Sequence, residues 1–224
     1  MKISFGHIKE ELLKDPFFEV RTLGKNTIRE RTLPVHRYGE APSCFQFIDW
    51  QDEDNHEIIQ YAFYSTEIGK LLIANTPKGI CFLGFAGENE PKVKSDFADR
   101  FPKQSIKEEV SHLQQLAVEY CNGRHEGMIP LHLKGTPFQI RIWKQLVRIP
   151  VGKLSTYGSL SDDPDAAQAV GSAVGANPVS YIIPCHRIVK SDGSFQGYHW
   201  GTEIKRVLLA YELQPNFQSE EKSV

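Results

Sequence analysis

A cysteine and a histidine stand side by side at Cys185 and His186, directly after an apolar run that ends in Pro184. A thiol attacks electrophiles as the thiolate, and a nearby histidine can accept the proton that must leave. Adjacent residues of an extended strand point to opposite faces, so the two side chains can share one site only if the strand ends at Pro184. An inert buried thiol is the common alternative, because free cysteine is among the most buried residue types.

A carboxylate near the C-terminal end favours the reactive interpretation. Four apolar residues recur there at helical spacing: Ile204, Val207, Leu208 and Tyr211. Glu212 falls eight positions after the first of them and on the same face, where a carboxylate is costly unless a partner satisfies it. A glutamate at a helix end that simply reaches solvent is the alternative. The functional hypothesis is a relay in which Glu212 orients His186 and His186 activates Cys185.

The segment from Asp165 to Ala176 is predicted to be a helix with two different faces. One face carries Ala166, Ala169, Val170 and Ala173, and the other carries Gln168, Gly171, Ser172 and Gly175. Close packing against another element is the common use of such a bare face. A small-residue helix can also press against the minor groove of DNA while one longer side chain, here Gln168, reaches in.

Periodicity and turn residues predict the elements that position these groups. Residues 58–85 hold β-rich segments separated by TEIG and TPKG, which is typical of an antiparallel meander. Residues 106–120 place apolar side chains at helical spacing, and Thr136 with Pro137 begins a further helix that Pro150 ends. A short helix is expected near residues 7–14 and a closing helix over 201–213. The fold class is therefore α+β, with a small N-terminal unit of antiparallel strands and a mostly helical C-terminal unit.

Composition favours an intracellular globular protein. The chain has 224 residues, 40% of them hydrophobic and 24% charged, and a formal net charge of −2. No apolar run has the length of a membrane span, and the first residues lack the apolar stretch of a secretory signal. Four scattered cysteines, with no CxxC pair, indicate reduced thiols: Cys44, Cys81, Cys121 and Cys185. We expect a cytoplasmic protein, or a nuclear one in a eukaryote.

Three segments resemble the O6-alkylguanine-DNA alkyltransferases, also called methylated-DNA–protein-cysteine methyltransferases. These segments are GTPFQIRIWKQLVRIPVGKLSTYGSL, QAVGSAVGANPVSYIIPCHRIVKSDGSFQGYHWG and IKRVLLAYE. The resemblance covers residues 130–213 well and residues 58–130 more loosely. It implies an N-terminal α/β unit that is ribonuclease H-like and a C-terminal domain that contains a helix-turn-helix. The domains would be an unassigned extension (1–57), an α+β domain (58–130), a DNA-binding and active-site domain (131–215) and a flexible tail (216–224).

The family's single-turnover chemistry would follow from this resemblance. Cys185 would accept the alkyl group from guanine O6, and possible substrates include O4-alkylthymine. His186 would deprotonate the thiol through a water, and Glu212 would fix the histidine. Tyr157 would assist the departing guanine, and Asn177 would brace the turn between recognition helix and active site. A thioether has no hydrolytic exit, so each molecule would act once and be spent.

The resemblance also implies a DNA-binding surface on the bare helix face and the loop near residue 200. Its members would be Gln168, Gly171, Ser172, Gly175, Tyr198, His199 and Trp200. The family normally has an arginine at the position of Gln168, so base extrusion or DNA affinity is expected to be weaker here. The segment over residues 158–165 is shorter than the family pattern. The bulk of His199 and Trp200 favours methyl over large adducts.

The expected partner is double-stranded DNA containing O6-alkylguanine, bound by a monomer. No cofactor and no structural zinc are expected, because the histidines and cysteines show no matching ligand spacing. Two alternatives remain open. A Cys-His hydrolase explains the Cys185 relay but not the bare helix. A protein that recognises alkylated DNA without reacting explains the helix, although such relatives replace the acceptor cysteine. Residues 1–57 match no family segment and stay unassigned, and the remnant of a regulatory fusion is one interpretation of them.

Overall fold

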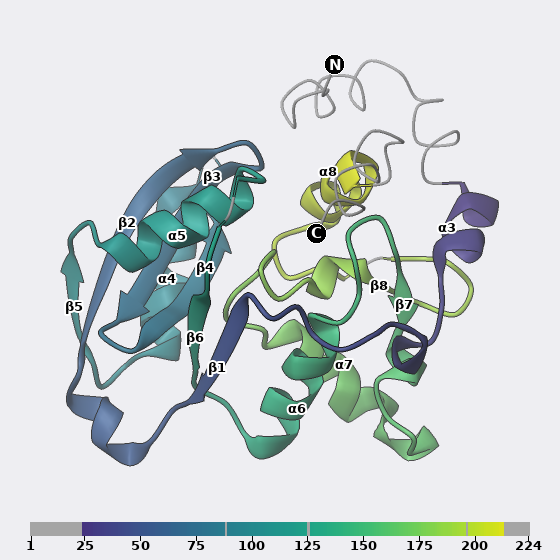
Figure 1. Cartoon of the computed structure of the whole chain (residues 1–224), viewed down its shortest axis with the longest axis horizontal. Coiled ribbons are helices and arrows are strands. Elements are labelled where there is room, and N and C mark those ends of the chain that lie inside the picture. Colours follow the sequence, from purple (N-terminus) through teal and green to yellow (C-terminus); the bar gives the residue numbers. More distant parts are fainter. Residues whose placement is uncertain (1–23, 88, 125, 196, 213–224) are drawn as a thin grey trace.

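The computed structural model describes residues 24–87, 89–124, 126–195 and 197–212. Figure 1 shows a sheet-containing unit beside a mostly helical unit. The predicted helix near residues 7–14 and the predicted tail over 216–224 lie outside the described residues. In the described part of the chain, no helix is long and apolar enough to cross a membrane.

The sheet unit contains six strands and two helices that pack on them. The elements are β1 (Phe45–Asp49), η2 (Asp52–His56), β2 (Ile58–Thr66), β3 (Gly69–Thr76), β4 (Gly79–Phe85), α4 (Glu90–Arg100), β5 (Ser105–Glu108), α5 (His112–Cys121) and β6 (Ile129–Leu133). The strand order is β1-β6-β4-β3-β2-β5. The pairs β2–β3 and β3–β4 are antiparallel, which confirms the predicted meander, and the β1–β6 and β2–β5 pairs are parallel.

Alternation along β3 explains the two layers of this unit. Leu72 and Ala74 belong to the core under α4, with Val93 and Phe97 of that helix. Leu71 and Ile73 point to the opposite face, where the core continues through α5 into the second unit. Successive strand residues face opposite sides of a sheet, so one strand supports both cores.

The helical unit positions the groups that could do chemistry. Its elements are α6 (Pro137–Leu146), β7 (Ser155–Thr156), η3 (Tyr157–Ser159), η4 (Pro164–Ala166), α7 (Ala167–Gly175), η5 (Cys185–Arg187), β8 (Ile188–Val189) and α8 (Thr202–Glu212). Thr136 caps α6 as predicted, in a capping box with Gln139. Where the resemblance implies a helix-turn-helix, the structure has the short 3₁₀ turns η3 and η4 before α7.

One predicted helix begins later than the sequence pattern indicates. Residues 106–108 belong to β5, where Ile106 pairs in register with Ile59, and Val110 is 63% exposed. The helix α5 begins at His112, because Ser111 and Gln114 form a capping box there. Parallel pairing with β2 therefore outweighs the local helical spacing of Ile106.

The structure also assigns part of the extension that sequence analysis left unassigned. Before β1 it contains α3 (Lys25–Arg31) and η1 (Val35–Arg37). The strand β1 is part of the six-stranded sheet, so the sheet unit includes residues before the expected boundary at 58. The strand β6 runs across the other expected boundary at 130/131. Inter-strand pairing, which local sequence does not encode, sets both limits.

Candidate active site

Cys185 lies at the first position of a 3₁₀ turn, Cys185–Arg187. Pro184 precedes the turn, and Cys185 N donates to Ile183 O at 2.8 Å. Tyr181 just upstream has a φ of 72°, the only positive value at a non-glycine residue in the described ranges. Such a conformation costs about 1–2 kcal/mol and persists where the surroundings enforce it. The expected turn after Pro184 is present, but the segment before it holds only isolated bridges and a turn at Tyr181–Ile182 instead of a strand. The side chains of Cys185 and His186 therefore need not face opposite ways.

Asn177 connects the helix α7 to the thiol. Its Nδ2 donates to Ile183 O at 2.7 Å and lies 3.1 Å from Cys185 Sγ, and its Oδ1 accepts from Val179 N at 3.0 Å. The side chain is 3% exposed. Asn177 therefore braces the turn between α7 and Cys185 and also donates a hydrogen bond to the sulfur.

The thiol is buried, with a relative exposure of 5%. Burial raises the pKa of Cys185, and the Asn177 hydrogen bond, the charge of Lys205 and the Tyr198 phenol lower that pKa in part. Deprotonation at neutral pH therefore needs a base and a stabilised thiolate. The groups that lower the pKa are those that would stabilise a negative sulfur.

His186 and Glu212 form the pair that the helix pattern predicted. His186 Nε2 lies 2.8 Å from Glu212 Oε1, and both side chains are at most 1% exposed. Burial lowers the pKa of His186 although Glu212 raises it, so the neutral ring is favoured. A neutral ring that donates from Nε2 leaves Nδ1 as an acceptor. Nδ1 is buried and has no hydrogen-bond partner among the described residues, so it is available to take a proton.

Arg187 completes this ion pair and was missed by sequence analysis. Its Nε and Nη2 donate to the two oxygens of Glu212, each at 2.9 Å, and its Nη1 donates to Ile149 O. Burial alone would raise the pKa of Glu212, but the charge of Arg187 and the bonds from both partners lower it to about 2. Glu212 is therefore a fixed anion, not a glutamate that reaches solvent.

Lys205 is a second buried cation that sequence analysis missed. It is 1% exposed, and its Nζ donates to Ile188 O at 2.5 Å and lies 5.9 Å from the centre of the Tyr198 ring. Burial lowers its pKa to about 8, and Cys185 raises it in part. Lys205 precedes Glu212 by seven positions, two helical turns, and this i, i+7 spacing was the available sequence signal.

Two tyrosines predicted for the site lie within electrostatic reach of the sulfur. Burial and then the charge of Cys185 raise the pKa of Tyr157, which opens η3. The same two causes raise the pKa of Tyr198 well above its ordinary value. The structure thus places Tyr157, Tyr198 and Asn177 near the thiol, while Glu212 holds His186, the next residue along the chain.

The bare face of α7 is exposed as predicted at Gln168, Ser172 and Gly175, and Gly171 is half-buried. A Cβ added at either glycine would meet open space, so small residues are not required there by internal packing. The buried face consists of Val170, Ala173 and Val174, and Trp143 Nε1 donates to Ala173 O. Ala169, which the sequence pattern groups with Val170 and Ala173, is exposed.

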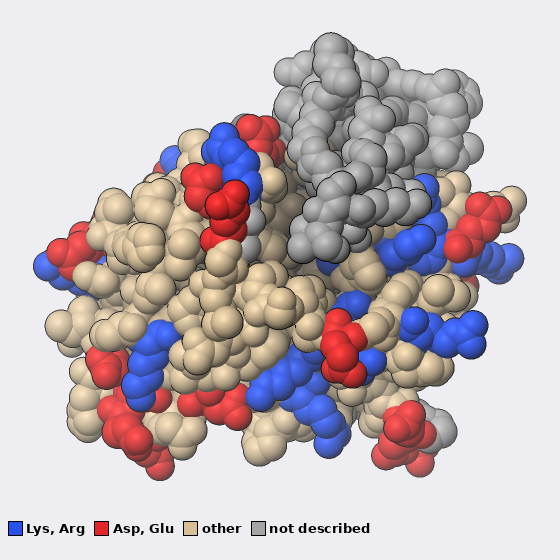
Figure 2. Space-filling model, viewed as in Figure 1, with Lys and Arg blue, Asp and Glu red and all other residues tan. Residues whose placement is uncertain are grey.

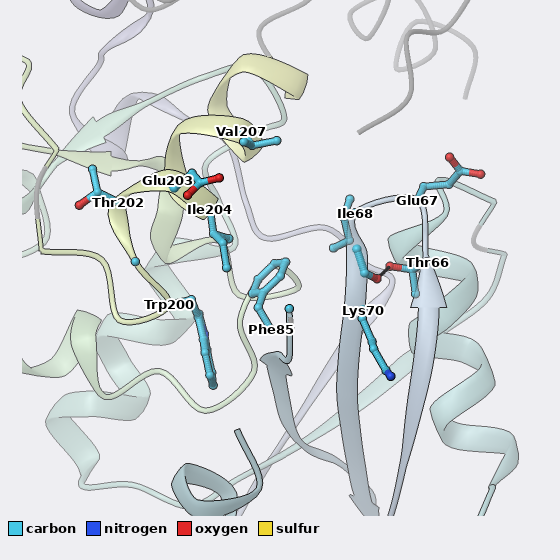
Figure 3. Close-up of a pocket in the computed structure, with 13 residues that line it drawn as sticks. Thr66, Glu67, Ile68, Lys70, Phe85, Trp200, Thr202, Glu203, Ile204 and Val207 are labelled. Carbon is cyan, nitrogen blue, oxygen red and sulfur yellow. Dashed lines mark hydrogen bonds between the residues drawn. The ribbon is translucent and has the colours of Figure 1, made fainter. Parts of the chain in front are cut away.

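His199 and Trp200 lie toward the sheet unit. His199 Nε2 is 3.0 Å from Asp96 Oδ1 on α4, and Trp200 Nε1 donates to Ser180 Oγ at 2.6 Å. Trp200 also lines a cavity of about 730 Å³. Figure 3 shows Ile204 of α8 on one side of this cavity and Ile68 on the opposite side. Cys185 does not line this cavity. The role of His199 and Trp200 in adduct preference stays a prediction.

Metal ligands do not gather in the described part of the chain, where no group of three or more His, Cys, Asp or Glu side chains could hold an ion. Its cysteines at 44, 81, 121 and 185 are free thiols. Burial raises the pKa of Cys81 and Cys121 far above the ordinary value. Among the described residues, Cys185 is the cysteine whose sulfur has a side-chain amide donor, Asn177 Nδ2.

Comparison with known proteins agrees with this geometry. Two family models match: the ribonuclease-like domain of 6-O-methylguanine DNA methyltransferase over residues 59–121, and its DNA binding domain over residues 137–214. The chain is 41% identical over 164 residues to a methylated-DNA–protein-cysteine methyltransferase of Haemophilus influenzae, which covers 70% of this chain and 88% of that protein.

Solved structures give the same result. The O6-methylguanine methyltransferase of Mycobacterium tuberculosis is 32% identical and matches with a TM-score of 0.55 over 69% of this chain and 93% of its own. The OGT of the same organism in complex with DNA is 30% identical and matches with a TM-score of 0.53, covering 68% of this chain and 92% of its own. The two family models match the sheet unit and the helical unit in turn, and the relative from Haemophilus influenzae is 41% identical. This chain therefore belongs to the 6-O-methylguanine DNA methyltransferase family.

Proposed function

We propose that this protein repairs DNA by moving the alkyl group of O6-alkylguanine to Cys185 in one irreversible step. The observation that carries the proposal is the buried constellation in which Cys185 Sγ lies 3.1 Å from a donor and His186 is held by an ionised Glu212. A soft sulfur nucleophile is suited to attack at an alkyl carbon, and the thioether product resists hydrolysis. The relatives that carry this chemistry in their names support the assignment.

The proton of the thiol goes to His186 Nδ1, through a water molecule, because the other ring nitrogen is engaged by Glu212. The thiolate attacks the O6-bound carbon, so that an S–C bond forms while the C–O6 bond breaks. The electron pair of that bond stays on the guanine, which takes a proton to become the normal base. Tyr157 and Tyr198 lie within electrostatic reach of the sulfur, where their phenols can supply hydrogen bonds to the departing base.

Duplex binding through α7 would bring the lesion to the thiol. The exposed face of α7 lacks bulk, so it can approach the minor groove closely, and Gln168 is the long side chain that would enter the stack. A reacting base must leave the helix to reach a buried sulfur, and glutamine can fill the resulting gap by hydrogen bonding but adds no charge. The substrates would be O6-methylguanine before larger adducts, with O4-alkylthymine as a further candidate.

A stoichiometric titration tests this function. A duplex with one O6-methylguanine is incubated with increasing protein, and the lesion that remains is measured by nucleoside chromatography. Loss of one lesion per protein molecule, with no further loss on longer incubation, is the expected result. Continued turnover would instead indicate a hydrolase-like reaction. Binding without any loss of lesion would place the protein among those that recognise alkylated DNA and do not react.

A further inference from the structure

An N-terminal arm, residues 24–42, packs against the helical unit and lies outside both family models. It pairs with the chain that leads into β7: Leu33 N donates to Leu154 O at 3.0 Å, and Leu154 N donates to Arg31 O at 2.9 Å. The Tyr38 hydroxyl donates to the same Leu154 carbonyl at 2.6 Å, and Ser155 Oγ donates to Leu33 O at 2.6 Å. The arm is therefore fixed beside β7 by hydrogen bonds from both chains.

The arm also contacts the turn after β8. Ile28, Arg29 and Thr32 of the arm line a small cavity together with Lys190, Ser191 and Gly193. Ile28 is 1% exposed, so α3 is anchored by an apolar side chain while Arg29 stays exposed. Figure 1 shows α3 next to β7 and β8 at the edge of the helical unit.

Cations gather where the arm meets this unit. Arg29, Arg37, Lys153 and Lys190 are exposed, and in the described ranges none of the four forms a salt bridge with a carboxylate. Figure 2 shows Lys and Arg side chains over α3 and the neighbouring β7–β8 region, with a few carboxylates between them. This concentration contrasts with the net charge of −2 for the whole chain.

The cationic surface starts close to the thiol along the chain. Cys185 and Lys190 are joined by η5 and β8, a path of five residues. Five residues span at most about 17 Å, which is about half of the roughly 34 Å helical turn of duplex DNA. Lys190 therefore lies within half a helical turn of duplex DNA from Cys185, and Arg29 lines the same small cavity as Lys190.

We propose that Arg29 and Lys190, with Arg37 and Lys153 farther along, form an accessory surface that binds the phosphates flanking the lesion. This inference rests on the proposed function, and it adds a contact that the helix α7 does not provide. Exposed cations that contact phosphate supply sequence-independent affinity through counterion release. Such a surface would compensate for the missing charge at Gln168.

The test compares the salt dependence of DNA binding. Fluorescence anisotropy with an unmodified 30-base-pair duplex measures Kd between about 50 and 200 mM salt, the range in which phosphate contacts change affinity most visibly. In the Arg29→Ala/Lys190→Ala variant, we expect the slope of log Kd against log salt to fall by about 0.9 for each lost contact. The charge-preserving Arg29→Lys/Lys190→Arg variant should keep the wild-type slope.

The matched control removes two exposed cations from the sheet unit, in Lys92→Ala/Lys103→Ala, and should leave the slope unchanged. Thermal unfolding of every variant checks that the fold is retained. A slope for Arg29→Ala/Lys190→Ala equal to that of the control would overturn the accessory surface, while stoichiometric lesion removal by the wild-type protein would still support the proposed function. Absence of both DNA binding and lesion removal in the wild-type protein would overturn the proposed function itself.

Discussion

Replacing Glu212 by glutamine removes the one carboxylate that two buried partners share. Glu212 is 1% exposed, and it accepts from His186 and from two nitrogens of Arg187. The Glu212→Gln variant leaves the guanidinium of Arg187, 4% exposed, without its counter-charge. Breaking a buried ion pair from one side costs about 3–5 kcal/mol of unfolding free energy. For a chain of this size the loss corresponds to a Tm decrease of roughly 6–20 °C.

The pH dependence gives an independent value for the same interaction. The folded pKa of Glu212 is about 2, against 4.5 for a free glutamate. A depressed carboxyl pKa contributes stability that is present above the unfolded pKa and lost as pH falls toward the folded one, here worth about 3 kcal/mol. The difference in unfolding free energy between wild type and Glu212→Gln should therefore shrink between pH 4.5 and pH 2.

Urea unfolding followed by circular dichroism at pH 7 and pH 3 measures both effects. Glu119→Gln is the matched control, because Glu119 also pairs with an arginine, Arg124, but at 45% exposure. That exposed pair should change the unfolding free energy by less than about 1 kcal/mol. If Glu212→Gln were no more destabilising than Glu119→Gln at pH 7, the assignment of Glu212 as the buried anchor of His186 would be refuted.

Three further perturbations test other parts of the site. Asn177→Ala removes the hydrogen bond to Cys185 Sγ, so the thiol pKa should rise and the pH–rate curve of alkyl transfer should move to higher pH; an unmoved curve would contradict this. In the folded wild type, Lys205 loses its proton at a pKa of about 8, whereas in the unfolded chain it does so at 10.5. The unfolding free energy of the wild type relative to Lys205→Met should therefore increase from pH 8 to 10.5, by up to about 3 kcal/mol, as measured by chemical denaturation. In Gly84→Ala the new Cβ would lie 2.5 Å from Trp200, so overpacking should cost about 1–3 kcal/mol and change the tryptophan emission; an unchanged spectrum and Tm would show that the two units pack more loosely.

Three residues of the site could be predicted from sequence because their neighbours in the chain indicate their roles. Cys185 and His186 are adjacent after a proline, and Glu212 falls on the apolar face of a helix, where it needs a partner. Both observations required only local sequence and elementary chemistry. The structure confirms the pairing of His186 with Glu212 at 2.8 Å.

The features that the sequence did not predict depend on contacts between segments that are far apart in the chain. Arg187 has no periodic pattern, and its role follows from a helix 25 residues farther along the chain. The N-terminal arm is held through backbone groups of Leu154, more than 115 positions away, so its side chains give no strand or helix signal. At residues 106–108 the local pattern favours a helix, but pairing with β2 decides for a strand.

Intact-protein mass measured before and after incubation with a duplex containing one O6-methylguanine tests the central claim most directly. We predict a stoichiometric gain of about 14 Da, the signature of a methyl group on a sulfur nucleophile, which peptide mapping assigns to Cys185. Cys185→Ala should show no gain, and Cys81→Ala should react like the wild type, because the Cys81 thiol is buried and its pKa is strongly raised. A full gain in Cys185→Ala, or an adduct mapped to another residue, would contradict the account.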